Sequence, residues 1–118
     1  METPVRIAIY TRVDTADQAD ISFNFQESLL EAYAKKQGYE VVVSIRDIGN
    51  GLSCDRLGLN ALLEISPHQV QGVLVKNVDR IGRNLIQVKN WIEQFETPGR
   101  KVLSMDDSMT FIRAIQRS

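Results

Sequence analysis

The chain is divided by four short apolar runs, which cover residues 5–10, 40–45, 72–77 and 101–105. The first three runs are almost continuous and contain many valine and isoleucine residues. Such runs are typical of strands that are buried on both faces of a parallel sheet. The pattern therefore predicts four strands, separated by longer and more polar connecting segments.

Between these runs, apolar residues recur at helical spacing. The recurrence predicts helices over residues 24–37, 57–65 and 84–97. Gly38 and Pro98 directly follow the first and third of these segments, where they favour the end of a helix. The alternation predicts an α/β fold of three layers, in which a mostly parallel central sheet has helices on both faces.

The composition narrows the class of protein. A chain of 118 residues suits one domain, so residues 1–118 are expected to form a single unit. The net charge of −1 lacks the basic excess of most nucleic-acid-binding domains, so any contact with DNA must come from a local cluster or another domain. The single cysteine, Cys54, fits a reducing compartment. Without a signal peptide or an apolar run of membrane-spanning length, we expect a cytoplasmic protein with no membrane contact.

Charged residues gather where the predicted strands end. In α/β folds of this kind, ligands bind at the carboxyl ends of the strands. The charged residues near those ends are Arg12, Asp47, Arg56, Asp79, Arg80 and Arg83. Clustered arginines bind phosphate in a bidentate manner, which predicts an anion pocket of phosphate size. A network of surface ion pairs is the alternative. Gly49 and Gly51 predict that the loop after the second strand is mobile.

Several short sequences resemble one known family. They are YTRVDTADQ at 10–18, Gln26, LEAYA at 30–34, DRLGL at 55–59 and VLVKNVDRIGRN at 73–84. Their order over residues 5–107 resembles the catalytic domain of the serine recombinases, the resolvase and invertase family. The block DRIGRN after an apolar strand is the most specific part of the match. The resemblance implies a resolvase-like catalytic fold.

The resemblance also implies a reaction and a set of site residues. Such enzymes recombine DNA at specific sites, through a serine that attacks a phosphodiester and forms a 5′-phosphoseryl link without a metal or other cofactor. DNA is then the partner, and the whole protein is expected to form dimers or tetramers. By motif position, the phosphate-binding arginines are Arg12, Arg56, Arg80 and Arg83. Asp79 is expected to assist proton transfer or to hold an arginine. The other residues assigned to the phosphate and DNA site are Tyr10, Gln18, Gln26 and Asp47.

Position 14 departs from the family pattern, because an aspartate stands where the family has its nucleophilic serine. A carboxylate at neutral pH repels a phosphodiester, and its attack would yield an acyl phosphate that hydrolyses readily. Asp14 is instead expected to pair with Arg12, Arg80 and Arg83 as a built-in anion. We therefore predict a recombinase catalytic domain that is inactive in strand cleavage.

Two other functions remain as alternatives. One is a non-enzymatic partner that keeps the recombinase fold for DNA binding or regulation. The other is a receiver-like signalling domain phosphorylated at Asp79, although arginines at the strand ends fit that class poorly. In the family, the catalytic domain is followed by a long dimerisation helix and a separate DNA-binding domain, which we expect this sequence to lack. Phe111, Ile112 and Ile115 predict at most a short helix before Ser118.

The remaining notable residues are interpreted as structural or solvated. Trp91 is expected to pack in the core rather than to stack on bases. His68 has no second histidine and no nearby cysteine pair, so a metal site is not expected. Lys76, Arg100 and Lys101 are interpreted as solvated charges or as charges near a phosphate.

Overall fold

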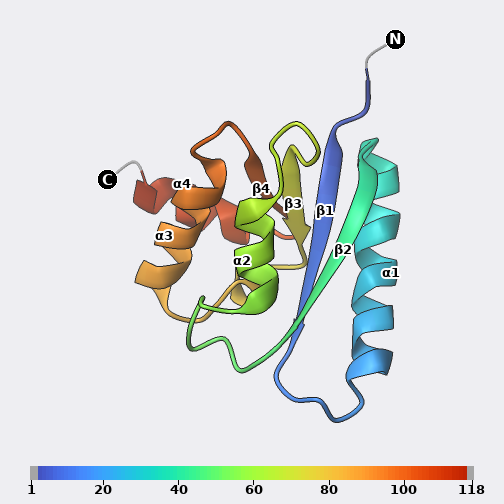
Figure 1. The fold of residues 1–118 in the computed structure, drawn as a ribbon, viewed down its shortest axis with the longest axis vertical. Helices are drawn as coiled ribbons and strands as arrows, with labels where there is room; N and C mark the ends of the chain where they lie inside the picture. Colours follow the sequence, from blue (N-terminus) through green and yellow to red (C-terminus); the bar gives the residue numbers. More distant parts are fainter. Residues whose placement is uncertain (1–2, 117–118) are drawn as a thin grey trace.

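Strands and helices alternate along the chain in the computed structural model, which describes residues 3–116 (Figure 1). The strands are β1 (Arg6–Val13), β2 (Glu40–Ile48), β3 (Gly72–Val75) and β4 (Lys101–Ser104). The helices are α1 (Ala19–Gln37), α2 (Leu57–Glu64), α3 (Leu85–Glu96) and α4 (Ser108–Gln116), and a short 3-10 helix, η1 (Val78–Arg80), follows β3. No helix in this part of the chain is long and apolar enough to cross a membrane.

The sheet is parallel throughout and has the strand order β2-β1-β3-β4. Arg12 of β1 lies beside Asp47 of β2, and Ile9 of β1 lies beside Leu74 of β3. The chain leaves β1 toward β2 and leaves β3 toward β4, so the two connections diverge from neighbouring strands. This divergence creates a crevice at the carboxyl ends of β1 and β3, the position at which α/β folds bind ligands.

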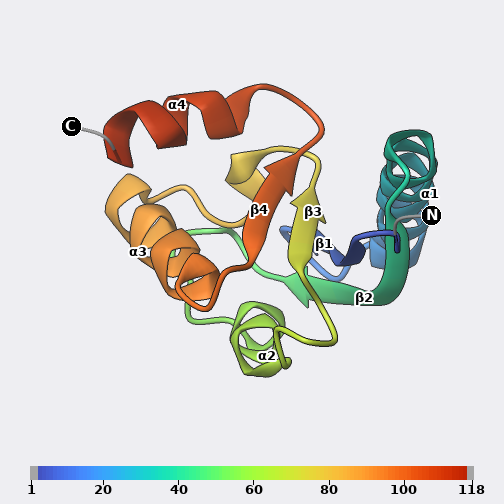
Figure 2. The same cartoon turned by 90° about the horizontal axis from the view of Figure 1, so that it is seen from above.

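Two hydrophobic clusters lie on opposite faces of the sheet. On one face, Leu30 and Ala34 of α1 pack with Ile7, Ile9 and Leu74 of the sheet. The cluster on the other face joins α2, α3 and α4 to the sheet. Figure 2 shows α1 and α3 separated by the strands, with α4 beside α3. The parallel sheet between layers of helices confirms the predicted fold class.

Three elements extend beyond their predicted bounds, namely α1, β1 and β2, and β2 runs to Ile48 rather than to residue 45 and includes the buried Asp47. α1 begins at Ala19 rather than at residue 24, and its buried stripe includes Gln26. β1 continues to Val13, which makes Thr11 and Arg12 buried strand residues rather than loop residues. The apolar runs that predict β1 and β2 end before the buried polar residues of these strands, which are Thr11 and Arg12 in β1 and Asp47 in β2.

The segment after β4 forms a helix where the sequence predicts at most a short one. Ile112 of α4 is 2% exposed and packs in the core, whereas the neighbouring Phe111 is 61% exposed. Arg113 donates to the carboxylate of Glu96 at 2.6 Å and so ties α4 to the end of α3. The apolar face and this ion pair together explain why the short helix is formed.

Arg100 is not the solvated charge that the sequence suggests. It is 3% exposed, and its guanidinium carbon lies 4.3 Å from the centre of the Phe95 ring. Its N–H groups donate to the carbonyls of Phe95 at 2.9 Å, Ile65 at 2.6 Å and Leu62 at 3.4 Å. These carbonyls lie at the C-terminal ends of α3 and α2, where backbone acceptors lack helical partners. Arg100 therefore joins the ends of the two helices.

We predict that Arg100→Lys lowers the free energy of unfolding by roughly 2 kcal/mol, because an ammonium group cannot reproduce the planar set of hydrogen bonds. Urea denaturation followed by circular dichroism measures the loss. The matched control is Lys101→Ala, since this neighbouring cation is exposed and its removal should change stability by less than about 0.5 kcal/mol. Equal stability of Arg100→Lys and the unmodified chain would contradict this role of Arg100.

Candidate functional site

The guanidinium group of Arg12 connects the segments that follow β1, β2 and β3. The residue is 1% exposed. Its Nη1 donates to Oδ1 of Asp14 at 2.6 Å and to the carbonyl of Gly49 at 2.7 Å. Its Nε donates to the carbonyl of Arg80 at 3.1 Å, and its Nη2 donates to the carbonyl of Asp79 at 3.0 Å. A buried cation is stable only when it is paired and hydrogen-bonded, and these contacts meet that condition.

The loop after β2 is held against Arg12. Gly51 has a φ of 81°, and a Cβ at this position would lie 3.1 Å from Cζ of Arg12. The carbonyl of Gly51 accepts from the backbone N–H of Arg83 at 2.8 Å, and the N–H of Gly49 donates to the carbonyl of Val13 at 2.8 Å. Gly51 therefore permits close approach to Arg12, whereas the sequence predicted that the glycines make this loop mobile.

Asp47 caps the first turn of α2 from the neighbouring strand. Its Oδ1 accepts from the N–H of Gly58 at 2.8 Å, and its Oδ2 accepts from the N–H of Leu59 at 3.2 Å. A Cβ on Gly58 would lie 2.6 Å from Oδ2 of Asp47, so the carboxylate can approach only because that residue is glycine. Tyr10 donates its hydroxyl to Oδ2 at 2.7 Å. Burial and this hydrogen bond raise the pKa of Tyr10, which keeps the phenol protonated as a donor.

Arg56 is also held by protein acceptors. Its Nε lies 3.7 Å from Oδ2 of Asp47, and its Nη1 donates to the carbonyl of Ser53 at 2.9 Å. Its Nη2 donates to the hydroxyl of Tyr10 at 3.1 Å and to the carbonyl of Ile81. The residues expected to bind phosphate thus fall into two groups, one held by other groups of the protein and one that faces the hollow described next. Tyr10, Arg12, Asp47 and Arg56 are bound to one another or to the backbone, and they hold in place the loops around the site.

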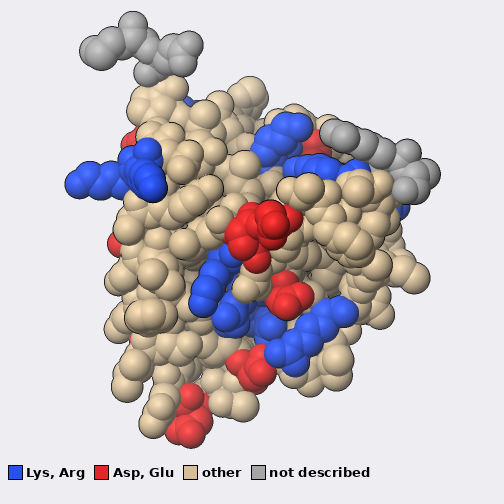
Figure 3. Space-filling view, turned by 180° about the vertical axis from the view of Figure 1, so that it is seen from behind, with Lys and Arg blue, Asp and Glu red and all other residues tan. Residues whose placement is uncertain are grey.

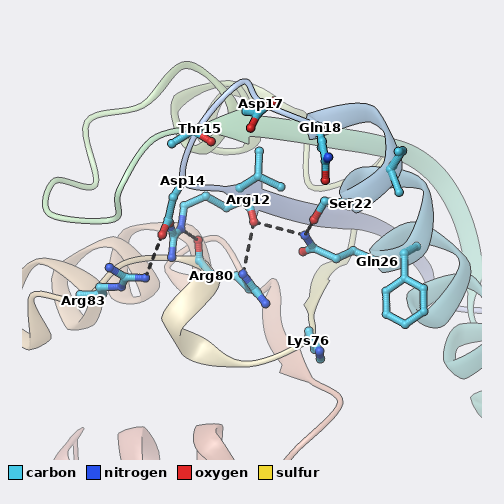
Figure 4. Close-up of a pocket in the computed structure, with 13 residues that line it drawn as sticks. Arg12, Asp14, Thr15, Asp17, Gln18, Ser22, Gln26, Lys76, Arg80 and Arg83 are labelled. Atoms are coloured by element: carbon cyan, nitrogen blue, oxygen red, sulfur yellow. Dashed lines mark hydrogen bonds and ion pairs between the residues drawn. The ribbon is translucent and has the colours of Figure 1, made fainter.

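An open hollow of about 570 Å³ lies in the crevice between β1, β3 and the start of α1. Its volume is in the usual range for small-molecule sites, about 300–1,000 Å³. The polar residues along it are Arg12, Asp14, Thr15, Asp17, Gln18, Ser22, Gln26, Lys76, Arg80 and Arg83 (Figure 4). In Figure 3, basic and acidic side chains lie next to one another across one face of the molecule. The hollow therefore offers charges of both signs to a ligand.

Asp14 occupies the edge of this hollow as an anion. Its side chain is 51% exposed and lies 2.6 Å from Nη1 of Arg12 and 3.4 Å from Nη2 of Arg83. The hydrogen bond from Arg12, with a smaller contribution from the charge of Arg83, lowers the pKa of Asp14 below the ordinary carboxyl value. The carboxylate is therefore ionised at neutral pH. The expected pairing is present for Arg12 and Arg83, whereas Arg80 makes no direct ion pair with Asp14 among the described residues.

Two polar atoms at the base of the hollow have no hydrogen-bond partner within residues 3–116. They are Nε of Arg80 and Oε1 of Gln26. Gln26 is 5% exposed, and its Nε2 donates to the carbonyl of Arg12 at 3.3 Å and to Oγ of Ser22 at 3.2 Å. Nη1 of Arg80 donates to the same carbonyl of Arg12 at 3.3 Å. Burial and the nearby charge of Arg12 lower the pKa of Arg80. One donor and one acceptor thus remain unmet beside a cationic group.

The other expected site residues differ in their positions. Gln18 borders the hollow at the start of α1, where its φ of 55° is left-handed. Asp79 lines a different hollow, between η1 and α4, and only its carbonyl reaches Arg12. Lys76 and Phe25 line the main hollow although sequence reasoning did not assign them to it. Lys76 directly follows β3, so the strand-end rule could have found it, but Phe25 gave no comparable indication.

No metal centre is apparent in the described part of the chain. Residues 3–116 contain no group of three or more histidine, cysteine, aspartate or glutamate side chains placed to hold an ion. Cys54 is half-buried, and burial raises the pKa of its thiol, which disfavours the reactive thiolate.

Trp91 packs in the core as expected. It is 4% exposed, and its ring centre lies 5.2 Å from that of Phe95.

We predict that Asp47→Ala lowers the free energy of unfolding by about 3 kcal/mol, because it leaves the first turn of α2 and the hydroxyl of Tyr10 without their acceptor and removes the carboxylate beside Arg56. Asp47→Asn should lose less, since its amide oxygen can still accept. Chemical denaturation measures both losses. Asp55→Ala removes an exposed carboxylate from the same loop and serves as the control. A loss below about 0.5 kcal/mol for Asp47→Ala would be the size of an ordinary surface change and would contradict a capping role.

Comparisons with known proteins show the family and the fold to which this chain is similar. The family described as "Resolvase, N terminal domain" matches residues 7–117. The Transposon Tn3 resolvase of Escherichia coli is 32% identical over 106 residues, which are 90% of this chain and 53% of the relative. The chain thus spans about half the length of the curated relatives it matches.

Solved structures share the fold. The C-terminal catalytic domain of ISC1926 TnpA, an IS607-like serine recombinase, has a TM-score of 0.77 and 31% identity, over 95% of this chain and 78% of that one. The N-terminal catalytic domain of TP901-1 integrase has a TM-score of 0.77 and 24% identity, over 95% and 94%. These matches confirm the resemblance inferred from the motifs. The chain belongs to the resolvase family and has the catalytic-domain fold of the serine recombinases.

Proposed function

We propose that this chain is the catalytic domain of a site-specific DNA recombinase in which Asp14 prevents strand cleavage. DNA is the partner in this proposal, as for the family, and the dimer or tetramer belongs to the whole protein. The hollow beside Asp14 receives a phosphate of the DNA strand, with Lys76, Arg80 and Arg83 as its cations. Residues 1–118 act as one domain.

The observation that carries the proposal is the ion pair between Asp14 and Arg12 at 2.6 Å. In the family reaction, a serine oxygen bonds to phosphorus while the bond to the 3′ oxygen breaks, and the serine proton passes to the leaving group. An ionised carboxylate has no proton to give, and it repels the phosphodiester that it would attack. Because Arg12 and Arg83 stabilise this ionised form, the chain is expected to bind without cutting.

A non-enzymatic DNA-binding or regulatory partner is the second candidate. The cations along the hollow, Lys76, Arg80 and Arg83, favour it, since they can attract a phosphate whether or not cleavage follows. A receiver-like signalling domain has no comparable support, because Asp79 lies outside the main hollow. The two candidates that remain share the phosphate site and differ in whether a serine at position 14 restores cleavage.

Removing the charge of Asp14 should strengthen anion binding. We predict that Asp14→Asn binds dimethyl phosphate about fivefold more tightly than the unmodified chain, the upper range for one exposed charge in water. Backbone amide shifts in an NMR titration measure the affinity and locate the site. The matched control is Asp17→Asn, which removes the same charge from the same hollow without breaking the pair with Arg12. An equal or smaller gain for Asp14→Asn would show that the ion pair does not compete with phosphate.

Restoring a serine should restore the covalent step. We predict that Asp14→Ser forms a covalent adduct with DNA, whereas the unmodified chain and Asp14→Ala do not. The assay uses nicked duplexes of randomised sequence, labelled at the 3′ end of the cleaved strand, because the adduct forms on the 5′ phosphate. Adducts are scored on a denaturing gel after boiling.

The three chains separate the two candidates. An adduct with Asp14→Ser alone would mean that the aspartate silences an otherwise competent site. An adduct with the unmodified chain would contradict the proposed inactivity, and digestion of that adduct would identify the residue attached. Thr15 and Ser22 carry the hydroxyl groups that line the hollow. No adduct with any chain, together with binding to the same duplexes, would favour the non-enzymatic partner.

A further inference from the structure

Two large apolar side chains border the same hollow as the cations. Ile21 is 70% exposed and Phe25 is 63% exposed, and both line the hollow from α1. They are four residues apart on a helix, so they lie on the same face, one turn from each other. Single exposed apolar residues are common on protein surfaces. A pair of exposed apolar side chains beside a charged hollow indicates a binding surface, and the proposed phosphate site does not use this pair.

The cations lie on the opposite wall. Lys76 follows β3 and Arg80 belongs to η1, whereas Gln18, Ser22 and Gln26 come from α1 or its start (Figure 4). The lining contains four cations and two anions, Arg12, Lys76, Arg80 and Arg83 against Asp14 and Asp17, so its formal charge is +2. Since Asp14 is paired with Arg12 and Arg83, the excess positive charge lies toward Lys76 and Arg80.

This arrangement matches the chemistry of a nucleotide. A nucleotide carries an anionic phosphate at one end and a flat apolar base at the other, and aromatic side chains stack on bases of any sequence. The side chains of Lys76 and Arg80 line the hollow as cations that can donate to a phosphate oxygen. The unpartnered Nε of Arg80 and Oε1 of Gln26 are buried beside it, so the direct contacts to a ligand come from the exposed ends of the lining side chains.

We propose that Phe25 stacks on an unpaired base of a DNA strand whose phosphate lies between Lys76 and Arg80, with Ile21 beside the same base. This inference rests on the proposed function and adds that the site binds one unstacked nucleotide, not the backbone alone. Within a duplex, both faces of a base are covered by its neighbours, so a phenyl ring at the rim of a hollow can reach the face of an unpaired base only. The domain therefore prefers DNA whose bases are open at the site.

The test compares two short single strands of equal length, one of thymidines and one without bases. Fluorescence anisotropy measures the binding of each to the unmodified chain, which should prefer the thymidine strand by about tenfold, within the range for stacking on one aromatic ring. Phe25→Ala should abolish the preference, and Phe25→Trp should keep it. The matched control is Phe111→Ala, because Phe111 is 61% exposed but lines the other hollow.

The same data separate this inference from the proposed function. Equal binding of both strands to the unmodified chain would overturn the inference, as would a preference that survives Phe25→Ala or is lost in Phe111→Ala. In any of these cases, weaker binding of the abasic strand to Lys76→Gln would leave the phosphate site intact. If neither strand binds to the unmodified chain, both the phosphate site and the base site are refuted.

Discussion

The burial of the Arg12 guanidinium is the interaction on which the rest of the site depends. A cation that is 1% exposed is destabilising unless its hydrogen bonds are satisfied, and here the acceptors come from the ends of three strands. The carbonyls of Gly49, Asp79 and Arg80 must therefore converge on one point. The positions of the β2 loop and of η1 follow from this requirement, and Gly51 fits closely over the guanidinium because it has no side chain.

Asp47, on the neighbouring strand, is a second buried charged group whose hydrogen bonds fix the position of other segments. Asp47 accepts from Tyr10 and from two backbone N–H groups of α2, and it lies 3.7 Å from Nε of Arg56. The arginines at the strand ends therefore have two different roles. Arg12 and Arg56 hold the loops in place, and Arg80 and Arg83, with Lys76, face the hollow. Clustered arginines in a sequence therefore do not all indicate direct ligand contacts.

Asp14 belongs to both parts of this arrangement. Its carboxylate completes the hydrogen bonds of Arg12 and also neutralises part of the charge that would attract a phosphate. An internal anion therefore lies at the edge of the cationic hollow. The aspartate is thus compatible with the fold of this family, and under the proposed function it prevents the covalent step. Any substitution at this position alters the Arg12 contacts as well as the reactivity.

The sequence by itself determined the fold class, the family and the edge of the sheet at which the charged residues gather. The near-continuous apolar runs correctly predicted that β1 and β3 are buried on both faces, but this prediction was wrong for the edge strand β2, whose residues alternate between exposed and partly buried. The motifs around Arg12 and the DRIGRN block lie at the ends of β1 and β3. Only the tertiary structure decided which charges are structural. Burial of Arg12, Arg56 and Arg100 depends on carbonyls from distant segments. That Phe25 and Lys76 line the same hollow depends on how α1 packs against the sheet. Local patterns encode which face of an element is apolar, but a buried polar group is stabilised by partners that no single segment contains.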